Sequence, residues 1–246
     1  MNWNHLVLLA RRTAILDELA AEIRETGASA TIKTIDFTDR GAWARTYQSL
    51  TDEGIEIDAL YHCAVQISAG ALHHTLPGDW EQIYRVNLLS TTSILCTLYQ
   101  DMLKRDRGTI VLFSSLTSHS GAPMSAPYGA TKTALYGMWR SLKYENNRTN
   151  VNLHLVSPGF VDTPLFENFI LRKVTNQQMR QSMLATRVPI TKPEVAARKI
   201  VEGVSRSRDY IVFPFRMCFA AFLVRRFPVV GKMFLRHATR AMGIDK

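Results

Sequence analysis

The sequence lacks the features that mark membrane-spanning, secreted and metal-binding proteins. Its longest uncharged run in the apolar tail, 217–224, is too short to cross a bilayer. The first residues have no basic segment leading into an apolar core, so we expect no cleavable signal peptide. The 3 cysteines are widely spaced and odd in number, which predicts a reducing compartment and no disulfide framework. We therefore expect a cytoplasmic protein without a metal site.

The composition is that of a globular domain with one unusual end. A chain of 246 residues with 46% hydrophobic and 21% charged residues is long enough for one large α/β domain. The net charge of +9 is unevenly placed, because residues 205–246 carry nine Lys or Arg against Asp209 and Asp245. The basic bias therefore belongs to the C-terminal tail.

Strand-like apolar runs alternate with helical spacings along most of the chain. We expect strands at 5–10, 30–36, 57–62, 109–113, 151–156 and 210–212, and helices at 15–23, 39–50, 80–103, 126–145 and 194–204. This alternation predicts an α/β protein with a Rossmann-like, doubly wound parallel sheet. We expect a single domain at 1–212, followed by a basic apolar extension at 213–246.

Ser115, Tyr128 and Lys132 form a set with a clear chemical use. Tyr128 and Lys132 are four residues apart, so they share one face of the predicted helix. Because an ammonium beside a phenol favours the phenolate, we expect Lys132 to lower the pKa of Tyr128. Ser115 follows a buried strand and is placed to hydrogen-bond the same reacting oxygen. The set predicts a proton donor or acceptor that works nearer neutral pH.

At these residues the chain resembles the short-chain dehydrogenase/reductase family, from about residue 4 to about residue 212. Carbonyl-reducing members use a Ser, Tyr and Lys at this spacing with an Asn on an earlier helix, and the matching residues here are Ser115, Tyr128, Lys132 and Asn87. The resemblance implies reversible hydride transfer between NADP(H) and a carbonyl. Tyr128 would donate the proton, Lys132 would also hold the nicotinamide ribose, and Asn87 would hold a water linked to Lys132.

Further residues match positions that hold the cofactor in that family. Arg11 follows the first strand, where an arginine suits the 2′-phosphate of NADP; otherwise it is an ordinary surface residue. Asp36 matches the aspartate that contacts adenine, or is a turn residue. Pro158, Gly159 and Thr163 match the Pro-Gly-x-x-x-Thr motif that borders the nicotinamide.

Residues 62–65 depart from the family. They read His-Cys-Ala-Val where the family ends a strand with Asn-Asn-Ala-Gly, so only Ala64 is kept. Val65 replaces a glycine that lets the backbone approach the cofactor closely. We interpret His62 and Cys63 as strand-end packing residues, because no further metal ligands follow at suitable spacing.

The largest departure is the absence of the Gly-rich turn and of the central strand and helix around it. That turn binds the cofactor pyrophosphate through backbone N–H groups. Without the strand we expect an interior gap in the sheet, and cofactor binding weakened roughly 10²- to 10⁵-fold. Either the true start of the protein lies upstream of Met1, or the domain compensates for the missing turn, or it binds NADP poorly. We favour a reductase whose start lies upstream of Met1.

Two other functions remain open at this stage. A non-catalytic binding or scaffold protein with a degenerate nucleotide site is favoured by Val65 and by the missing turn, and opposed by the complete Asn-Ser-Tyr-Lys set. Epimerase or dehydratase chemistry shares the Tyr-x-x-x-Lys pair. The resemblance also implies a homodimer or homotetramer formed through the two long helices at about 80–103 and 126–145.

The tail after residue 210 interleaves aromatic and aliphatic residues with arginines. Such a segment either closes a substrate pocket, packs in an oligomer interface, or lies on an anionic membrane surface. Each version suggests a bulky apolar carbonyl or alcohol substrate. We expect no nucleic-acid binding, because no reading motif accompanies the basic residues.

Overall fold

The computed structural model describes residues 4–165, 169–178, 189–215, 217, 219, 223, 226, 227 and 229. Its strands are β1 (His5–Ala10), β2 (Ser29–Thr34), β3 (Ala59–His62), β4 (Ser68–Ala69), β5 (Gly108–Phe113), β6 (Val151–Pro158), β7 (Phe160–Val161), β8 (Ile170–Leu171), β9 (Ile190–Thr191) and β10 (Tyr210–Phe213). Its helices are α1 (Thr13–Glu25), α2 (Ala42–Asp52), α3 (Pro77–Tyr84), α4 (Ser90–Arg105), α5 (Thr117–Ser120), α6 (Ala126–Glu145) and α8 (Pro193–Ser205).

The predicted alternation of strands and helices is confirmed, with one long helix divided. The helix expected at 80–103 consists of α3, a π-helical turn at Arg85–Leu89, and α4. The helix expected at 126–145 has those bounds. The segment 160–191 also contributes β7, β8 and β9, each two residues long, which no periodicity in the sequence marks.

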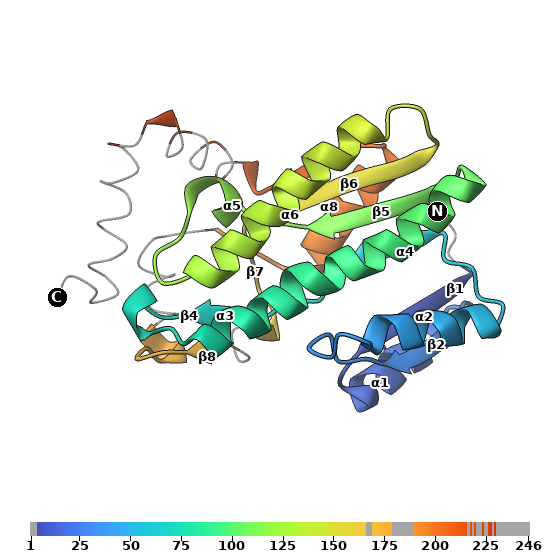
Figure 1. Ribbon diagram of the computed structural model, residues 1–246, viewed down its shortest axis with the longest axis horizontal. Coiled ribbons are helices and arrows are strands. Elements are labelled where there is room, and N and C mark those ends of the chain that lie inside the picture. The colour runs from blue at the N-terminus through green and yellow to red at the C-terminus, as the bar shows by residue number, and fades with distance from the viewer. Residues whose placement is uncertain are drawn as a thin grey trace.

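The strands are paired in parallel but do not form one continuous sheet. The larger sheet has the order β10-β6-β5-β3, and β1 pairs separately with β2. Within the described residues no ladder joins β1 to β3, so the expected interior gap is present. Figure 1 shows β1 and β2, with α1 and α2, beside the larger sheet.

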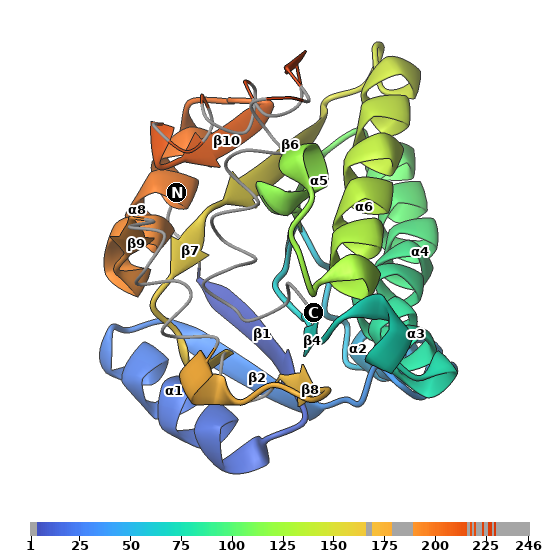
Figure 2. The same ribbon diagram turned by 90° about the vertical axis from the view of Figure 1, so that its left-hand side faces the viewer.

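Helices cover both faces of the larger sheet, as Figure 2 shows. On one face, α4 and α6 cover a core that contains Ile110, Leu112, Leu153 and Leu155. On the other, α8 covers a core that contains Val111, Val156, Ile211 and Phe213. Successive strand residues point to opposite faces, so β5 and β6 need apolar side chains on both sides.

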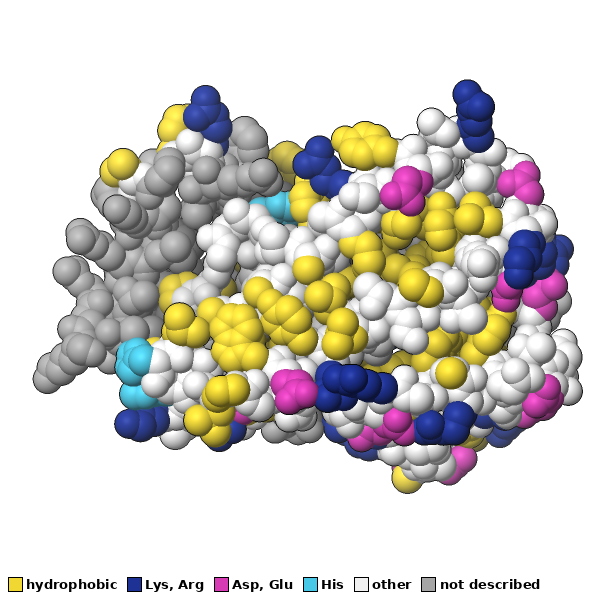
Figure 3. Space-filling model, viewed as in Figure 1, with side chains coloured by type: hydrophobic (Ala, Val, Ile, Leu, Met, Phe, Trp, Pro, Cys, Tyr) yellow, Lys and Arg dark blue, Asp and Glu magenta, His cyan; other side chains and the backbone are white. Residues whose placement is uncertain are grey.

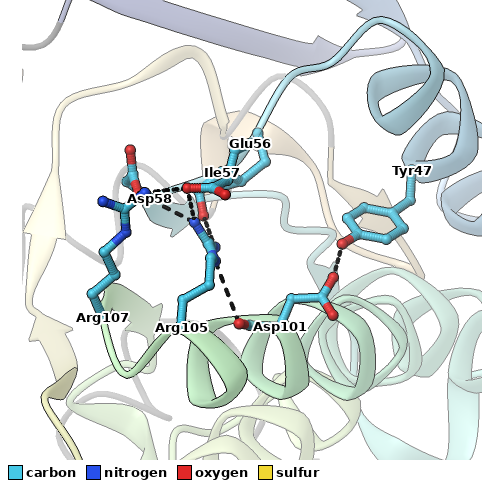
Figure 4. Close-up of polar contacts among 7 residues, drawn as sticks. All are labelled: Tyr47, Glu56, Ile57, Asp58, Asp101, Arg105 and Arg107. Atoms are coloured by element: carbon cyan, nitrogen blue, oxygen red, sulfur yellow. Dashed lines mark hydrogen bonds and ion pairs between the residues drawn. The ribbon is translucent and has the colours of Figure 1, made fainter.

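Helix contacts connect the β1–β2 part to the rest of the chain across the break. Trp43 of α2 is buried and donates its indole N–H to Thr97 Oγ1 of α4, over 2.8 Å. One turn later, the Tyr47 phenol donates to the Asp101 carboxylate (Figure 4). This contact and burial raise the pKa of Tyr47 to about 12, with burial the larger cause.

A second set of contacts fixes the start of β3 to the end of α4 (Figure 4). The Arg105 guanidinium donates to the Ile57 carbonyl oxygen over 2.9 Å and pairs with Glu56 and Asp58. Arg107 pairs with the same two carboxylates. The bonds to Glu56 keep the pKa of its carboxyl below the usual value, chiefly through Arg107. The connection between the two sheets therefore rests on α4.

Whether a helix could span a membrane can be judged for the described residues. None of their helices combines the length and the apolar character that a bilayer-spanning helix needs. The division of the chain into 1–212 and 213–246 stays a prediction.

Candidate active site

Ser115 and Tyr128 meet where β5 ends and α6 begins. The β5–β6 pairing continues past Phe113, because Ser114 N–H donates to the Val156 carbonyl oxygen over 2.8 Å. Ser115 therefore lies at the carboxyl end of a strand held on its β6 side, and it is 8% exposed. Pro127 stands in the first turn of α6, where a missing N–H costs little, and Tyr128 follows it. The Ser115 hydroxyl is near enough to the Tyr128 phenol to affect the pKa of that phenol.

The expectation that Lys132 lowers the pKa of Tyr128 is wrong for this structure. Burial raises the pKa of Tyr128, and the nearby Ser115 hydroxyl opposes that shift only in part. The Lys132 ammonium lies 5.7 Å from the centroid of the Tyr128 ring. Tyr128 consequently holds its proton at neutral pH.

Lys132 is buried, with only 3% of its surface exposed. Its ammonium donates to the Phe113 carbonyl oxygen at the end of β5, over 2.7 Å. Its own carbonyl oxygen accepts a hydrogen bond from the Ser114 hydroxyl over 2.9 Å. Burial lowers the pKa of Lys132 to about 8, a shift that Cys63 nearby partly opposes. Lys132 is still mostly charged at pH 7.

Asn87 lies at the π-helical turn between α3 and α4 and is 1% exposed. Its Oδ1 accepts the Gln66 N–H over 2.7 Å, and its Nδ2 donates to the Gln66 carbonyl oxygen over 2.9 Å. Nδ2 also donates to Thr131 Oγ1 of α6, over 3.1 Å. π turns often occur at functional sites because they redirect a side chain. Here Asn87 clamps the backbone of residue 66 beside α6. Its expected role of holding a water linked to Lys132 stays a prediction.

The expected cofactor residues fall into two groups. Pro158, Gly159 and Thr163 lie at and after the end of β6, next to the Ser115 loop, and the Pro158 carbonyl oxygen accepts the Leu116 N–H over 3.2 Å. A Cβ at Gly159 would stand 2.8 Å from Met217 Sδ, so a larger residue would have to displace its neighbours.

The second group follows the first two strands and β3. Arg11 is exposed immediately after β1. Asp36 is exposed after β2, and its Oδ1 accepts the Thr38 N–H and hydroxyl, each over 2.9 Å, so it forms a turn. Ala64 is partly buried after β3. The roles of these residues toward a cofactor stay predictions.

The interpretation of His62, at the end of β3, as a packing residue is confirmed. His62 is buried, stacks edge-on with Phe37 at 5.5 Å between ring centroids, and lies 3.4 Å from Ser90 Oγ. It thus connects the chain after β2 to β3 across the break in the sheet, as a packing residue. Cys63 beside it is exposed. In the described part of the chain, His, Cys, Asp and Glu form no group of three suited to a metal ion.

The site places a serine, a tyrosine and a lysine at the carboxyl ends of parallel strands, where nucleotides bind in open α/β sheets. Residues 1–173 match the family model described as short chain dehydrogenase. The chain belongs to the short-chain dehydrogenase family. Members of this family are oxidoreductases that use a nicotinamide nucleotide.

Individual relatives are distant but cover most of the chain. The chain is 27% identical over 180 residues to cyclopentanol dehydrogenase of Comamonas sp., covering 69% of this chain and 72% of the relative. A short-chain dehydrogenase/reductase from Burkholderia phymatum in complex with NAD has a TM-score of 0.79 at 19% identity, with 92% and 85% covered. A short-chain dehydrogenase from Sphingobium yanoikuyae in complex with NADPH has a TM-score of 0.75 at 18% identity, with 98% and 86% covered. These two structures show a shared fold.

The buried His62 predicts an acid-dependent loss of stability. Burial, and to a lesser degree Lys132, lowers the pKa of His62 from 6.5 to about 4. The unfolded chain therefore binds an extra proton between these values, so the stability from neutral His62 is complete above pH 6.5 and lost as the pH falls toward 4. We expect His62→Gln to remove about 2 kcal/mol of the stability lost between pH 7 and pH 4.5. Urea unfolding of both proteins at pH 7 and pH 4.5 measures the difference.

The variant His73→Gln provides the control for this experiment. His73 is exposed, so this change removes a histidine from the surface. It should lose the same stability on acidification as the unchanged protein. An equal acid-induced loss in His62→Gln and the unchanged protein would contradict the account.

Proposed function

We propose that this short-chain dehydrogenase is an NADP(H)-dependent oxidoreductase that reduces a carbonyl, or oxidises an alcohol, of a bulky apolar substrate. The observation that carries the proposal is the proximity of Ser115 to Tyr128, with the buried Lys132 one helical turn away and its ammonium 5.7 Å from the Tyr128 ring centroid. These three residue types together position an oxygen, transfer a proton and supply a nearby positive charge. The cyclopentanol dehydrogenase relative supports an apolar alcohol or ketone.

The residues present fit the two ends of an NADP(H) molecule. Pro158, Gly159 and Thr163, which match the family's Pro-Gly-x-x-x-Thr motif, would border the nicotinamide. Arg11, exposed at the end of β1, would bind the 2′-phosphate, which favours NADP over NAD. When bound, the nucleotide supplies or accepts the hydride, and the protein provides position and charge.

The proton chemistry follows from the environment of Tyr128. Because its raised pKa keeps the phenol protonated at neutral pH, Tyr128 donates the proton to the oxygen of a carbonyl being reduced. The Ser115 hydroxyl donates a hydrogen bond to the same oxygen and polarises the carbonyl. Lys132 places a positive charge one helical turn from Tyr128, with its ammonium 5.7 Å from the ring centroid. In the direction of alcohol oxidation Tyr128 must first lose its proton, so the rate should rise with pH.

Tyr128→Phe tests this assignment, since it removes the hydroxyl and keeps the ring. We expect turnover of cyclopentanone with NADPH to fall by about 10²- to 10⁴-fold, the usual range for loss of a general acid. NADPH binding, followed by protein fluorescence, should change by less than about threefold. Tyr144→Phe, at a side chain that is 71% exposed, serves as the control and should keep full turnover. Retained turnover in Tyr128→Phe would remove Tyr128 from the mechanism.

A non-catalytic binding protein is the second candidate, favoured by the missing ladder between β1 and β3. The break lies on the β1 side of β3, whose carboxyl end leads into Val65, where the family glycine is replaced. A folded protein that binds neither nicotinamide nucleotide would support this candidate.

We further propose that two or four copies associate through the outer face of α4 and α6. This face exposes Leu103 and Tyr144, and Leu89 just before α4. Figure 3 shows a band of hydrophobic side chains over these helices. Contiguous apolar surface of this kind marks interfaces between proteins. A monomeric mass by light scattering would contradict this proposal.

The tail is proposed to bind an anionic membrane surface. Phe215 is 81% exposed, and Phe219, Phe227 and Val229 are exposed as well. The Arg226 guanidinium lies 5.7 Å from the Phe227 ring centroid, so an aromatic group and a cation occur together. Aromatic and basic side chains in combination favour the interface of an anionic bilayer.

Sedimentation with liposomes tests the tail. We expect the full chain to sediment with phosphatidylserine-containing vesicles at low salt and to be released by high salt, because each basic residue near the surface contributes about 1 kcal/mol. Phe215→Ser combined with Phe219→Ser should weaken binding, whereas Tyr144→Ser on α6 should not. Absence of sedimentation would assign the tail to contacts within the protein or between its copies.

A further inference from the structure

The chain after β3 is hydrogen-bonded to the catalytic region at both ends. Gln66 is clamped through its N–H and carbonyl oxygen by Asn87. Four residues later, Gly70 N–H donates to the Met124 carbonyl oxygen over 2.9 Å. Met124 precedes Tyr128 by four residues, at the entrance to α6. The segment 66–70 therefore has a fixed position relative to Asn87 and Tyr128.

A distant segment is bound along the edge of this fixed one. β8 pairs in parallel with β4, and Ile170 N–H donates to the Ile67 carbonyl oxygen over 2.9 Å. Arg172 N–H donates to the Ala69 carbonyl oxygen over 2.8 Å. Figures 1 and 2 both show β8 beside β4 and α3. Two residues in each strand make a short ladder, which needs further contacts to be stable.

The further contact is an ion pair between Arg172 and Asp79 of α3. Nε of Arg172 donates to Asp79 Oδ2 over 2.8 Å, and Nη2 donates to Oδ1 over 2.6 Å. The Asp79 side chain is 6% exposed and that of Arg172 is 35% exposed. Asp79 Oδ2 also accepts the Leu76 N–H over 2.9 Å at the start of α3. A bidentate pair on a buried carboxylate is far stronger than a surface salt bridge, and Arg172 chiefly lowers the pKa of Asp79.

The packing at Gly70 gives an independent sign that residues 170–172 are held closely. A Cβ added to Gly70 would stand 2.7 Å from Arg172 Cβ and 2.9 Å from the Arg172 carbonyl oxygen. The second of these is a backbone atom, so the clash could be relieved only by moving the segment. By contrast, a Cβ added to Gly78 in α3 would meet nothing within 4 Å.

We propose that Asp79 is a substrate-positioning residue, which acts through Arg172 to fix residues 169–173 as a wall of the substrate site. The proposal rests on the proposed oxidoreductase function. Residues 169–173 pair with the segment 66–70, which Asn87 and Met124 hold in place, and the ion pair supports this pairing. The position of residues 169–173 relative to Tyr128 therefore depends on the ion pair. Loss of the pair should therefore loosen how the substrate is held, while Ser115, Tyr128 and Lys132 stay in place.

Hydrogen exchange tests the anchoring without any need for turnover. In Asp79→Asn and in Arg172→Gln, the backbone amides of Ile170 and Arg172 should exchange about tenfold or more faster, because the short ladder loses its charge-assisted support. Gly70→Ala should have the same effect by displacing the segment with the ion pair intact. Gly78→Ala, and Glu81→Gln at the exposed pair with Arg85 on α3, are the matched controls and should leave exchange at these amides unchanged.

Steady-state kinetics distinguish a substrate-positioning role of the ion pair from an effect on protein stability alone. With cyclopentanone and NADPH, Asp79→Asn and Gly70→Ala should raise KM about tenfold, with kcat and NADPH binding changed by less than about threefold. If the unchanged protein has no turnover, the proposed function fails, and the variants are then compared by ligand-observed NMR for binding of cyclopentanone. Loss of that binding in the variants supports the positioning role.

Two results would overturn the proposal. Unchanged exchange at Ile170 and Arg172 in Asp79→Asn would show that the ion pair does not hold the segment. Faster exchange together with unchanged KM, or with unchanged cyclopentanone binding, would assign the ion pair to the stability of α3 and β8 alone.

Discussion

The parallel pairing of β5 with β6 is the interaction on which the site depends. It continues into the loop through Ser114 and Leu116, so Ser115 leaves the strand in a defined direction. The end of β5 then provides the Phe113 carbonyl oxygen that binds the buried Lys132 ammonium. A buried cation without such a partner would lose its proton or pull the helix away. Strand pairing, lysine burial and the position of α6 are thus one connected arrangement, which brings Tyr128 near Ser115.

Among the residues that the structure describes, no strand ladder joins β1 to β3. Edge groups on two strands lose ladder partners, and the β1–β2 part is connected by α2–α4 contacts and by Phe37 packing on His62. These contacts are made by side chains and hold the two parts together. Arg11 and Gly159, which we propose bind the two ends of the nucleotide, therefore follow strands of different sheets.

Much of the fold and the centre of the site could be predicted from the sequence, because apolar periodicity and the Ser115-Tyr128-Lys132 spacing are local signals. The ion pair of Asp79 with Arg172 joins residues 93 positions apart and has no local pattern. The clamp of Asn87 on Gln66 likewise depends on the folded chain. The direction of the pKa shift of Tyr128 was mispredicted, since spacing shows that Lys132 is near but shows neither burial nor the Phe113 carbonyl that binds the ammonium.

The central claim is that this chain binds a nicotinamide nucleotide at the ends of its parallel strands and prefers NADPH. Calorimetric titration of residues 1–246 with NADPH, and separately with NADH, measures this directly. The account predicts NADPH binding with a Kd of about micromolar order and weaker NADH binding, since Arg11 would pair with the 2′-phosphate. A folded protein that binds neither nucleotide would contradict the claim, and equal binding of both would remove Arg11 as the source of preference.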